Sequence, residues 1–143
     1  MLFRSPSSKK PRKRKTVVRS GIPLTIRHGA DEETALQLAP HLELMKFREG
    51  IADEQSWHTI TARLNVGLTA AWQNDLEMDV FRRGLDAVIN VRERNKKSGR
   101  WALTGDDYRD IGEALTETDN LQLSLTRKQF AKSIEYVFAN AGM

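Results

Sequence analysis

The sequence predicts an all-α protein, a compact bundle of four to five helices with a disordered basic N-terminal arm. Three observations support this fold class. Residues 55–74 are apolar nearly all round at helical spacing, which is typical of a buried central helix. The flanking segments repeat apolar residues at intervals of three and four, between residues that cap or stop helices. Residues 1–20 combine prolines, serines and a dense basic run with too little apolar surface to fold alone.

The length of 143 residues fits one helical domain and the arm, with predicted bounds of 1–30 for the arm and 31–143 for the bundle. The absence of cysteine excludes disulfides and thiolate metal sites and favours a reducing compartment. No apolar run approaches the ~20 residues of a membrane span, and the start lacks the apolar segment of a secretory signal. We therefore expect a cytoplasmic protein, nucleoid-associated if it binds DNA, with no membrane partner.

The first helix is expected after the acidic residues 31–33, which suit a helix N-terminus. Its apolar stripe, expected to face the core, consists of Leu38, Leu42 and Met45, widened by Leu44 and Phe47. Pro40 fits only the first turn of a helix, so it predicts either a kink or a helix start there. Gly50 is expected to end the helix. Upstream, residues 17–18 and 22–26 are expected to form a short extended segment.

The central helix is predicted to be capped by Asp53 and to end near residues 73–75. One face is bulky and is expected in the core; it carries Trp57, Ile60, Leu64, Leu68, Ala71 and Trp72. The opposite face has small or neutral groups suited to a second neighbour, namely Ala62, Val66, Thr69 and Ala70. Arg63 is the only charged side chain on this stretch, so the helix indicates architecture and not chemistry.

Residues 76–97 predict the next helix, because a polar strip runs along one side of an otherwise apolar segment. Gly84 in its interior costs about 1 kcal/mol relative to alanine, a cost that close packing against a neighbouring helix would explain. Ser98 and Gly99 are expected to stop this helix.

Thr104 and Asp107 resemble a capping box that opens a further helix. A break is predicted within residues 118–126, since the apolar positions before and after it point in different directions. Thr126 and Gln129 offer a second capping box after the break, which gives the fifth helix.

The strongest local signal for function is the charge of the arm. Residues 1–30 hold nine basic residues and no acid, whereas residues 31–143 hold fourteen basic and nineteen acidic residues, a net charge of −5. Closely spaced cations displace the counterions condensed on nucleic acids and give salt-dependent affinity that is largely independent of sequence. The candidate phosphate contacts are Lys9, Lys10, Arg12, Lys13, Arg14, Lys15 and Arg19. The alternatives are a nuclear localisation signal and a tail that only solubilises the protein or contacts its acidic body.

A second basic cluster is followed by Trp101, and cations beside an aromatic ring are typical of surfaces that hold a nucleic-acid strand. The candidate contacts are Arg94, Lys96, Lys97 and Arg100, with Arg92 beside them. The structural alternative is that these cations stabilise a helix C-terminus while Trp101 anchors the turn in the core.

A third basic group, consisting of Arg127, Lys128 and Lys132, is expected on a solvated helix face. The turn before it is nevertheless the best candidate for a helix-turn-helix, because only there does a turn lead into a basic helix.

Enzyme motifs are nearly absent from the sequence. His28, His41 and His58 share no metal-ligand spacing, and neither a glycine-rich phosphate loop nor a nucleophile elbow is found. We therefore expect no catalytic activity, no metal and no cofactor.

Several motifs carry a resemblance to a known group of proteins. They are Leu44-x-x-Phe47-Arg48-x-Gly50, Trp57-His58, Leu64-Asn65, Gly99-Arg100-Trp101 and Leu103-Thr104. On these residues the chain resembles small all-α proteins of unknown function from proteobacterial phages, prophages and plasmids, over roughly residues 35–135. The resemblance implies a bacterial or phage setting, in which nuclear import loses its weight. It implies no catalytic or binding residue, and it does not include the arm.

The sequence thus favours a non-enzymatic nucleic-acid-associated accessory or regulatory protein. The basic arm would contact the phosphates of DNA or RNA, and the helical body would form oligomers, such as a homodimer, or contact a partner. The first alternative is a phage-type inhibitor or adaptor whose acidic body docks on a host protein. The second is a structural component of a virion or nucleoprotein particle.

Overall fold

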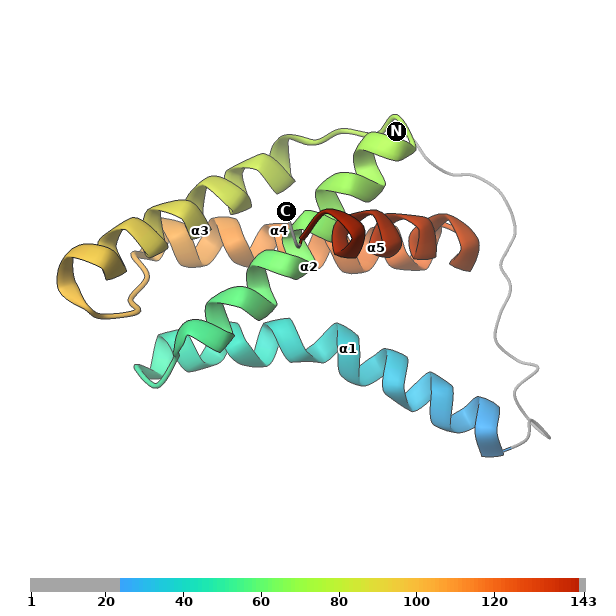
Figure 1. Ribbon diagram of the computed structural model, residues 1–143, viewed down its shortest axis with the longest axis horizontal. Coiled ribbons are helices and arrows are strands. Elements are labelled where there is room, and N and C mark those ends of the chain that lie inside the picture. Colours follow the sequence, from blue (N-terminus) through green and yellow to red (C-terminus); the bar gives the residue numbers. More distant parts are fainter. Residues whose placement is uncertain (1–23, 142–143) are drawn as a thin grey trace. The chain divides into compact units, whose positions relative to one another are not determined.

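The computed structural model describes residues 24–141, and the side chains of residues 37–140. Within that part of the chain it contains five α-helices and no strand, which confirms the predicted all-α class (Figure 1). The helices are α1 (Leu24–Glu49), α2 (Glu54–Gln73), α3 (Asp79–Ser98), α4 (Gly105–Ser124) and α5 (Arg127–Ala141). The chain divides into two compact units, 1–38 and 39–143, and the packing described below is that of the second.

α1 begins earlier than the sequence indicated and runs through Pro40 without ending there. Residues 24–26, predicted to be extended, form its first turn, so that prediction and a start near residue 31 are wrong. Pro40 removes one backbone hydrogen bond, but it is flanked by good helix formers that continue the helix on both sides. The predictions for residues 1–20 concern a segment outside the described residues.

α1 turns only one edge of its predicted apolar stripe to the core. Three residues of the expected stripe are about half exposed: Leu38, Leu42 and Met45. Pro40, Leu44 and Phe47 repeat the same spacing two positions later and are buried. Leu44 and Phe47 join the core cluster that also contains Ile60 and Ile111, so the second row of apolar residues is the one that packs.

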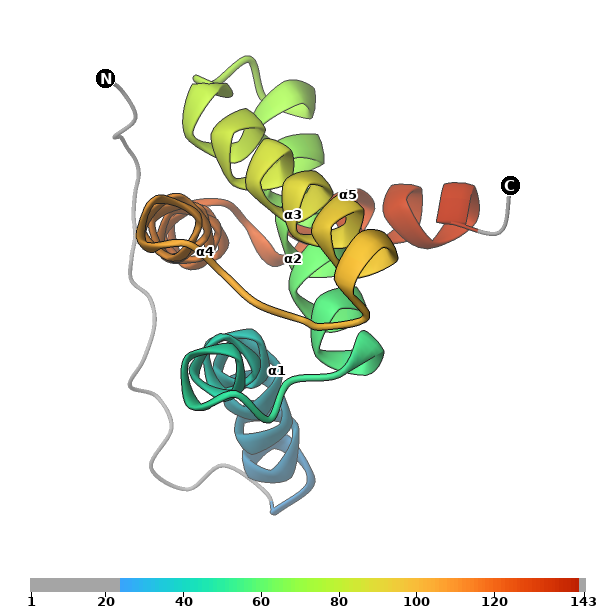
Figure 2. The ribbon, with the colours of Figure 1, turned by 90° about the vertical axis from the view of Figure 1, so that its left-hand side faces the viewer.

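α2 is the central helix, as predicted, and contacts α3, α4 and α5 (Figure 2). Asp53 caps it through a capping box with Ser56, and Asn74 follows its last residue. Most of the predicted bulky face is buried, including Trp57, Ile60, Leu64 and Ala71. Trp72 is the exception, because 53% of its surface is exposed at the C-terminal end of the helix. The prediction of Trp72 as a core residue is therefore wrong.

Two glycines allow the helices of the bundle to approach closely. A Cβ atom on Gly84 of α3 would lie 2.6 Å from the Cβ atom of Ala114 on α4, which confirms the expected reason for a glycine there. A Cβ atom on Gly67 of α2 would collide with the Thr118 hydroxyl and would lie 2.8 Å from the Phe81 ring. An alanine fits at neither position unless neighbouring atoms shift.

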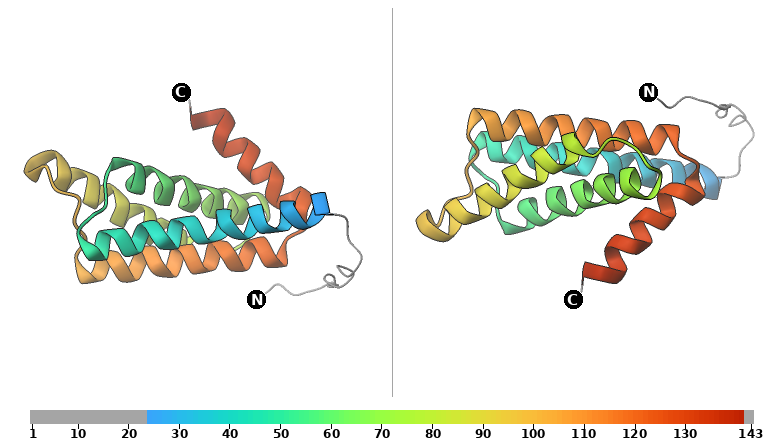
Figure 3. Two further views of the ribbon diagram at one scale, coloured as in Figure 1. Left: turned by 90° about the horizontal axis from the view of Figure 1, so that it is seen from below. Right: turned by 90° about the horizontal axis from the view of Figure 1, so that it is seen from above.

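Local signals close the remaining helices as predicted. Thr104 and Asp107 form the capping box that opens α4. α4 ends at Ser124, and the Thr126 hydroxyl accepts from the Gln129 N–H at 3.0 Å while the Gln129 side chain accepts from the Thr126 N–H at 2.9 Å. α5 then leaves the other helices at an angle, and its C-terminal half extends away from them (Figure 3).

Candidate nucleic-acid interface

The structure describes only one of the two predicted groups of nucleic-acid contacts. The arm residues Lys9, Lys10, Arg12, Lys13, Arg14, Lys15 and Arg19 lie outside the described residues. The second group lies where α3 ends and the chain turns toward α4, and the geometry of that junction determines which of its cations face solvent.

α3 ends because Gly99 adopts the left-handed conformation, with φ of 76°, as predicted for this stop. Its N–H donates to the Asn95 carbonyl at 2.7 Å. Lys96 and Lys97 occupy the last turn, where cations are favoured by the negative end of the helix dipole. Stabilisation of the helix C-terminus therefore explains why both lysines occur here. Their side chains are nevertheless exposed to solvent.

Arg94 is committed to the protein itself. Its guanidinium donates to the Asp107 carboxylate and to the Ala102 carbonyl, the latter at 3.2 Å. Asp107 is buried and also accepts from the Thr104 N–H in the capping box of α4. Arg94 thereby ties the end of α3 to the start of α4 through one of its two terminal guanidinium nitrogens.

The other three cations of this group are exposed. Lys96 pairs with Glu93 at 3.2 Å, an exposed contact between residues three apart on the same helix. Lys97 and Arg100 have no ion-pair partner among the described residues. Lys97 and Arg100 are thus the cations of this junction that are best placed to contact phosphate.

Trp101 anchors the junction in the core, as the structural interpretation predicted. Its ring lies 6.2 Å from that of Trp57, and it packs against the main core cluster. Trp57 is fixed by its Nε1–H, which donates to the Val88 carbonyl at 2.8 Å. The Arg92 guanidinium covers the outer side of Trp57 at 4.6 Å from the ring centroid, a cation–π contact that the sequence did not reveal.

The third basic group is exposed at the start of α5, as predicted for Arg127, Lys128 and Lys132. The preceding turn consists of Leu125 and Thr126 only, because the capping box of Thr126 starts α5 immediately. A tight turn thus does lead into a basic helix, as the helix-turn-helix hypothesis requires.

A polar network that the sequence did not predict lies on the other side of the central helix. The Asp119 carboxylate accepts from Arg63 at 2.8 Å through one oxygen and is hydrogen-bonded to His41 Nε2 at 2.8 Å through the other. Arg63 also donates to Gln122 at 2.7 Å. The signal for a partner was Arg63 itself, since a lone charge on an apolar helix is seldom buried unpaired.

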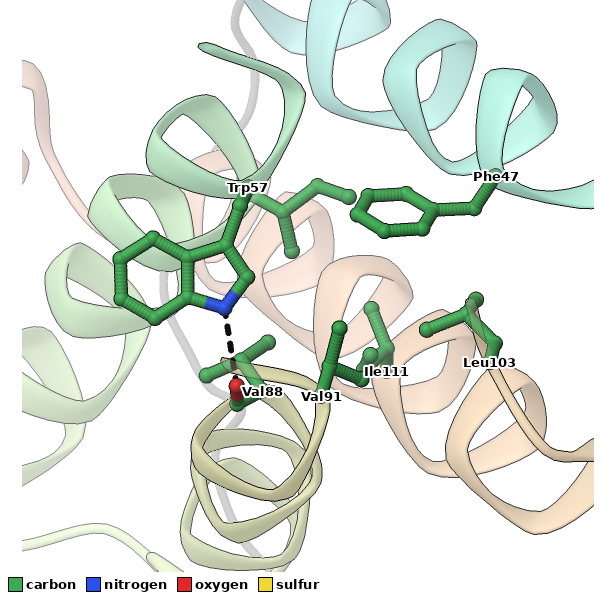
Figure 4. Close-up of a pocket in the computed structure, with 7 residues that line it drawn as sticks. Phe47, Trp57, Val88, Val91, Leu103 and Ile111 are labelled. Carbon is green, nitrogen blue, oxygen red and sulfur yellow. Dashed lines mark hydrogen bonds between the residues drawn. The ribbon is translucent and has the colours of Figure 1, made fainter. Parts of the chain in front are cut away.

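The core and the histidines offer no evident chemistry within the described residues. The small hollow beside Trp57, lined by Phe47, Val88, Val91, Leu103 and Ile111 among others, has no room for a water molecule and is a packing seam (Figure 4). His58 is exposed and contacts Glu54 at 3.3 Å. No group of three or more potential metal ligands occurs in the part of the chain that the structure describes.

The fold is that of an all-α protein with one group of exposed cations where α3 turns into α4 and another at the start of α5. Comparison with protein-family models, with curated proteins and with solved structures found no match. Among the described helices, none is long and apolar enough to cross a membrane.

Proposed function

We propose that the protein is a non-enzymatic nucleic-acid-associated accessory or regulatory protein. The observation that carries the proposal is the separation of charge along the chain. Residues 1–30 hold nine basic residues and no acid, whereas the rest of the chain has a net charge of −5. A dense cationic segment is attracted to polyanions such as nucleic acids. The acidic body is repelled by them, so binding would be concentrated on the arm.

The α3–α4 junction supports the same function from the described part of the chain. Lys97 and Arg100 present two exposed cations that form no ion pair with an acidic residue of the described segments. The rigid anchor of Trp101 in the core holds the turn in place, so these cations would contact phosphates without ordering a loop first. The junction would thus add a fixed contact to those of the arm.

The test measures binding of fluorescently labelled DNA and RNA oligonucleotides across a salt series. The full chain is compared with a variant in which Lys9, Lys10, Arg12, Lys13, Arg14 and Lys15 are replaced by glutamine. Each lost phosphate contact should reduce the slope of log affinity against log salt by about 0.7–0.9. The variant should therefore bind several orders of magnitude more weakly at low salt.

The matched control is Arg109→Gln, which removes a cation from the acidic side of α4, where it contacts Asp106 and Asp110. That variant should keep the affinity and salt slope of the parent. Absence of binding at low salt, or a salt slope unchanged in the arm variant, would contradict the proposed function.

A protein-interaction module is the second candidate, favoured by the exposed acids Asp106 and Glu113 on α4. Such a body would dock on a basic host protein. Affinity capture from nuclease-treated host lysate distinguishes the two, because a stoichiometric protein partner that survives nuclease and moderate salt favours the adaptor.

A further inference from the structure

Trp72 and Tyr136 form an exposed aromatic pair where the end of α2 meets α5. Their ring centroids lie 5.5 Å apart, and the ring planes are tilted by 57°. The exposed fractions of the two residues are 53% and 44%. Large aromatic residues usually bury most of their surface, and a contiguous exposed group of them marks a binding surface.

The aromatic pair is held in place by contacts next to it on both helices. The Ser133 hydroxyl, fully buried, donates to the Gln73 side chain at 2.8 Å, which joins the residue after Trp72 to the turn before Tyr136. Phe130, one turn further back on α5, is buried in the core cluster that contains Ala71. The rings are therefore preformed and need no rearrangement to receive a ligand.

Two lysines lie beside the aromatic pair on α5. Lys132 and Lys128 precede Tyr136 by one and two helical turns, about 40° and 80° around the helix from it. Both side chains are exposed, and neither has an ion-pair partner within residues 37–140. The strip from Lys128 to Tyr136 thus places two positive charges next to an aromatic surface.

Three acidic residues lie close to this strip in sequence or beside Trp72, and none of them forms an ion pair with Lys128 or Lys132 in the described part of the chain. The Glu77 carboxylate is hydrogen-bonded within the protein. It accepts from the N–H groups of Met78 and Asp79 at 3.0 and 3.1 Å, at the start of α3. Glu135 lies about 100° from Tyr136 around α5, beyond Lys132 as seen from the ring. Asp75 is the remaining exposed acid close to Trp72 in sequence.

We infer that the aromatic pair and the two lysines bind single-stranded nucleic acid. A base would stack on the exposed surface of the aromatic pair, and Lys132 and Lys128 would contact the phosphates that follow. Every base has a π-face, so such a surface accepts any sequence but requires bases that are not already stacked in a duplex. The inference rests on the proposed function and narrows it to single strands.

The experiment measures binding of the full chain to a labelled single strand and to a duplex of the same length, at fixed salt. Replacement of Trp72 by alanine should weaken single-strand binding by about tenfold, within the range for loss of one stacked base. Duplex affinity should change less than twofold. Trp72→Phe keeps a ring and should retain most of the single-strand affinity, whereas Lys128→Gln with Lys132→Gln should lower the salt slope for single strands.

Phe138→Ala is the matched control, because Phe138 is an aromatic residue on the same helix that is 69% exposed but lies about 160° away from Tyr136. It should bind both oligonucleotides like the parent, and circular dichroism should show that every variant is folded.

The outcomes separate this inference from the proposed function. If the full chain binds nucleic acid but Trp72→Ala does so equally well, the inference is wrong and the proposed function stands. An equal loss of single-strand affinity in Phe138→Ala would also overturn the inference. So would a Trp72→Ala variant that changes only self-association, measured by light scattering, because the aromatic pair would then belong to a protein contact. If the full chain binds neither oligonucleotide, the proposed function itself fails.

Discussion

The Arg63 guanidinium donates to the Asp119 carboxylate at 2.8 Å, which pairs the only charged side chain of the predicted central stretch with α4. Only 11% of the Arg63 side chain is exposed. The second Asp119 oxygen is hydrogen-bonded to His41, so one carboxylate connects the C-terminal part of α1, α2 and α4. Burial of the Arg63 charge alone would be costly, and the ion pair with Asp119 offsets that cost while it joins α2 to α4.

Asp119→Ala should therefore be strongly destabilising, by about 2–4 kcal/mol, because it leaves Arg63 with one polar partner in a mostly buried position. The double variant Arg63→Met with Asp119→Leu should lose less, since it removes both charges. Urea unfolding of the parent and the variants gives these free energies. Glu113→Ala serves as the control, because its contact with Arg83 is exposed and 3.9 Å long and should contribute under about 0.5 kcal/mol.

Gly84→Ala should destabilise the protein by about 1–3 kcal/mol, although alanine favours helices by about 1 kcal/mol. The added methyl group would lie 2.6 Å from Ala114 and 3.2 Å from Leu64, both in the core. Gly112→Ala is the matched control on α4, since its nearest neighbour would be Leu44 at an ordinary 3.8 Å. Thermal unfolding should show a lower midpoint for the first variant and an equal or higher midpoint for the second.

The two tryptophans of α2 should respond differently to truncation. Trp57→Ala removes a buried ring together with the hydrogen bond to Val88 and should cost about 3–5 kcal/mol. Leu64→Ala, also fully buried, should cost about 2–5 kcal/mol. Trp72→Ala should cost under about 1 kcal/mol, because the ring is more exposed than buried. Equal losses for Trp57 and Trp72 would contradict the observed orientation of α2.

Most helix ends were predictable because each depends on residues close together in sequence, whereas α3 begins at Asp79, three residues after the predicted start, and has no side-chain cap there. Asp53, Thr104 and Thr126 accept from an N–H three residues later, and Gly99 ends α3 through its own conformation. Such signals are complete within a few residues. The start of α1 was missed because no comparable cap marks it in the sequence.

Orientation was harder to predict because it depends on partners far away in the chain. α1 carries two apolar rows at identical spacing, and only the position of Ile60 and Ile111 determines that Leu44 and Phe47 face inward. The same limit applies to the site. Its exposed cations were identified from composition, but the commitment of Arg94 to Asp107 and the contact between Trp72 and Tyr136 arise only when separate helices meet.

The capping box of α2 should give the stability a specific pH dependence. The Ser56 N–H, and secondarily its hydroxyl, hold the pKa of Asp53 below its ordinary value of 3.8. A carboxylate with a lowered folded pKa contributes stability that is fully present above its unfolded pKa and is lost as pH falls through the folded value. Asp53→Asn keeps a capping acceptor but does not titrate.

The difference in unfolding free energy between the parent and Asp53→Asn should therefore be constant near neutral pH and should shift against the parent below about pH 4. Urea unfolding at several pH values measures it. Ser56→Ala keeps the larger backbone contribution and loses the hydroxyl, so it should retain part of this pH dependence. A difference that does not vary with pH would show that the hydrogen bonds do not favour the charged form.

At the α3–α4 junction, different residues should determine the stability of the protein and its affinity for nucleic acid. Arg94→Gln should lower stability by about 1–2 kcal/mol, because the buried Asp107 loses its charged partner. Lys97→Gln combined with Arg100→Gln should leave the melting temperature unchanged, since neither cation has an ion-pair partner in the described segments. The double variant should instead reduce the slope of log affinity against log salt for nucleic acid by about 1.4–1.8, that is, by two phosphate contacts. If it binds like the parent while Arg94→Gln weakens binding without unfolding, then Arg94, and not the two exposed cations, is the contact to phosphate at this junction.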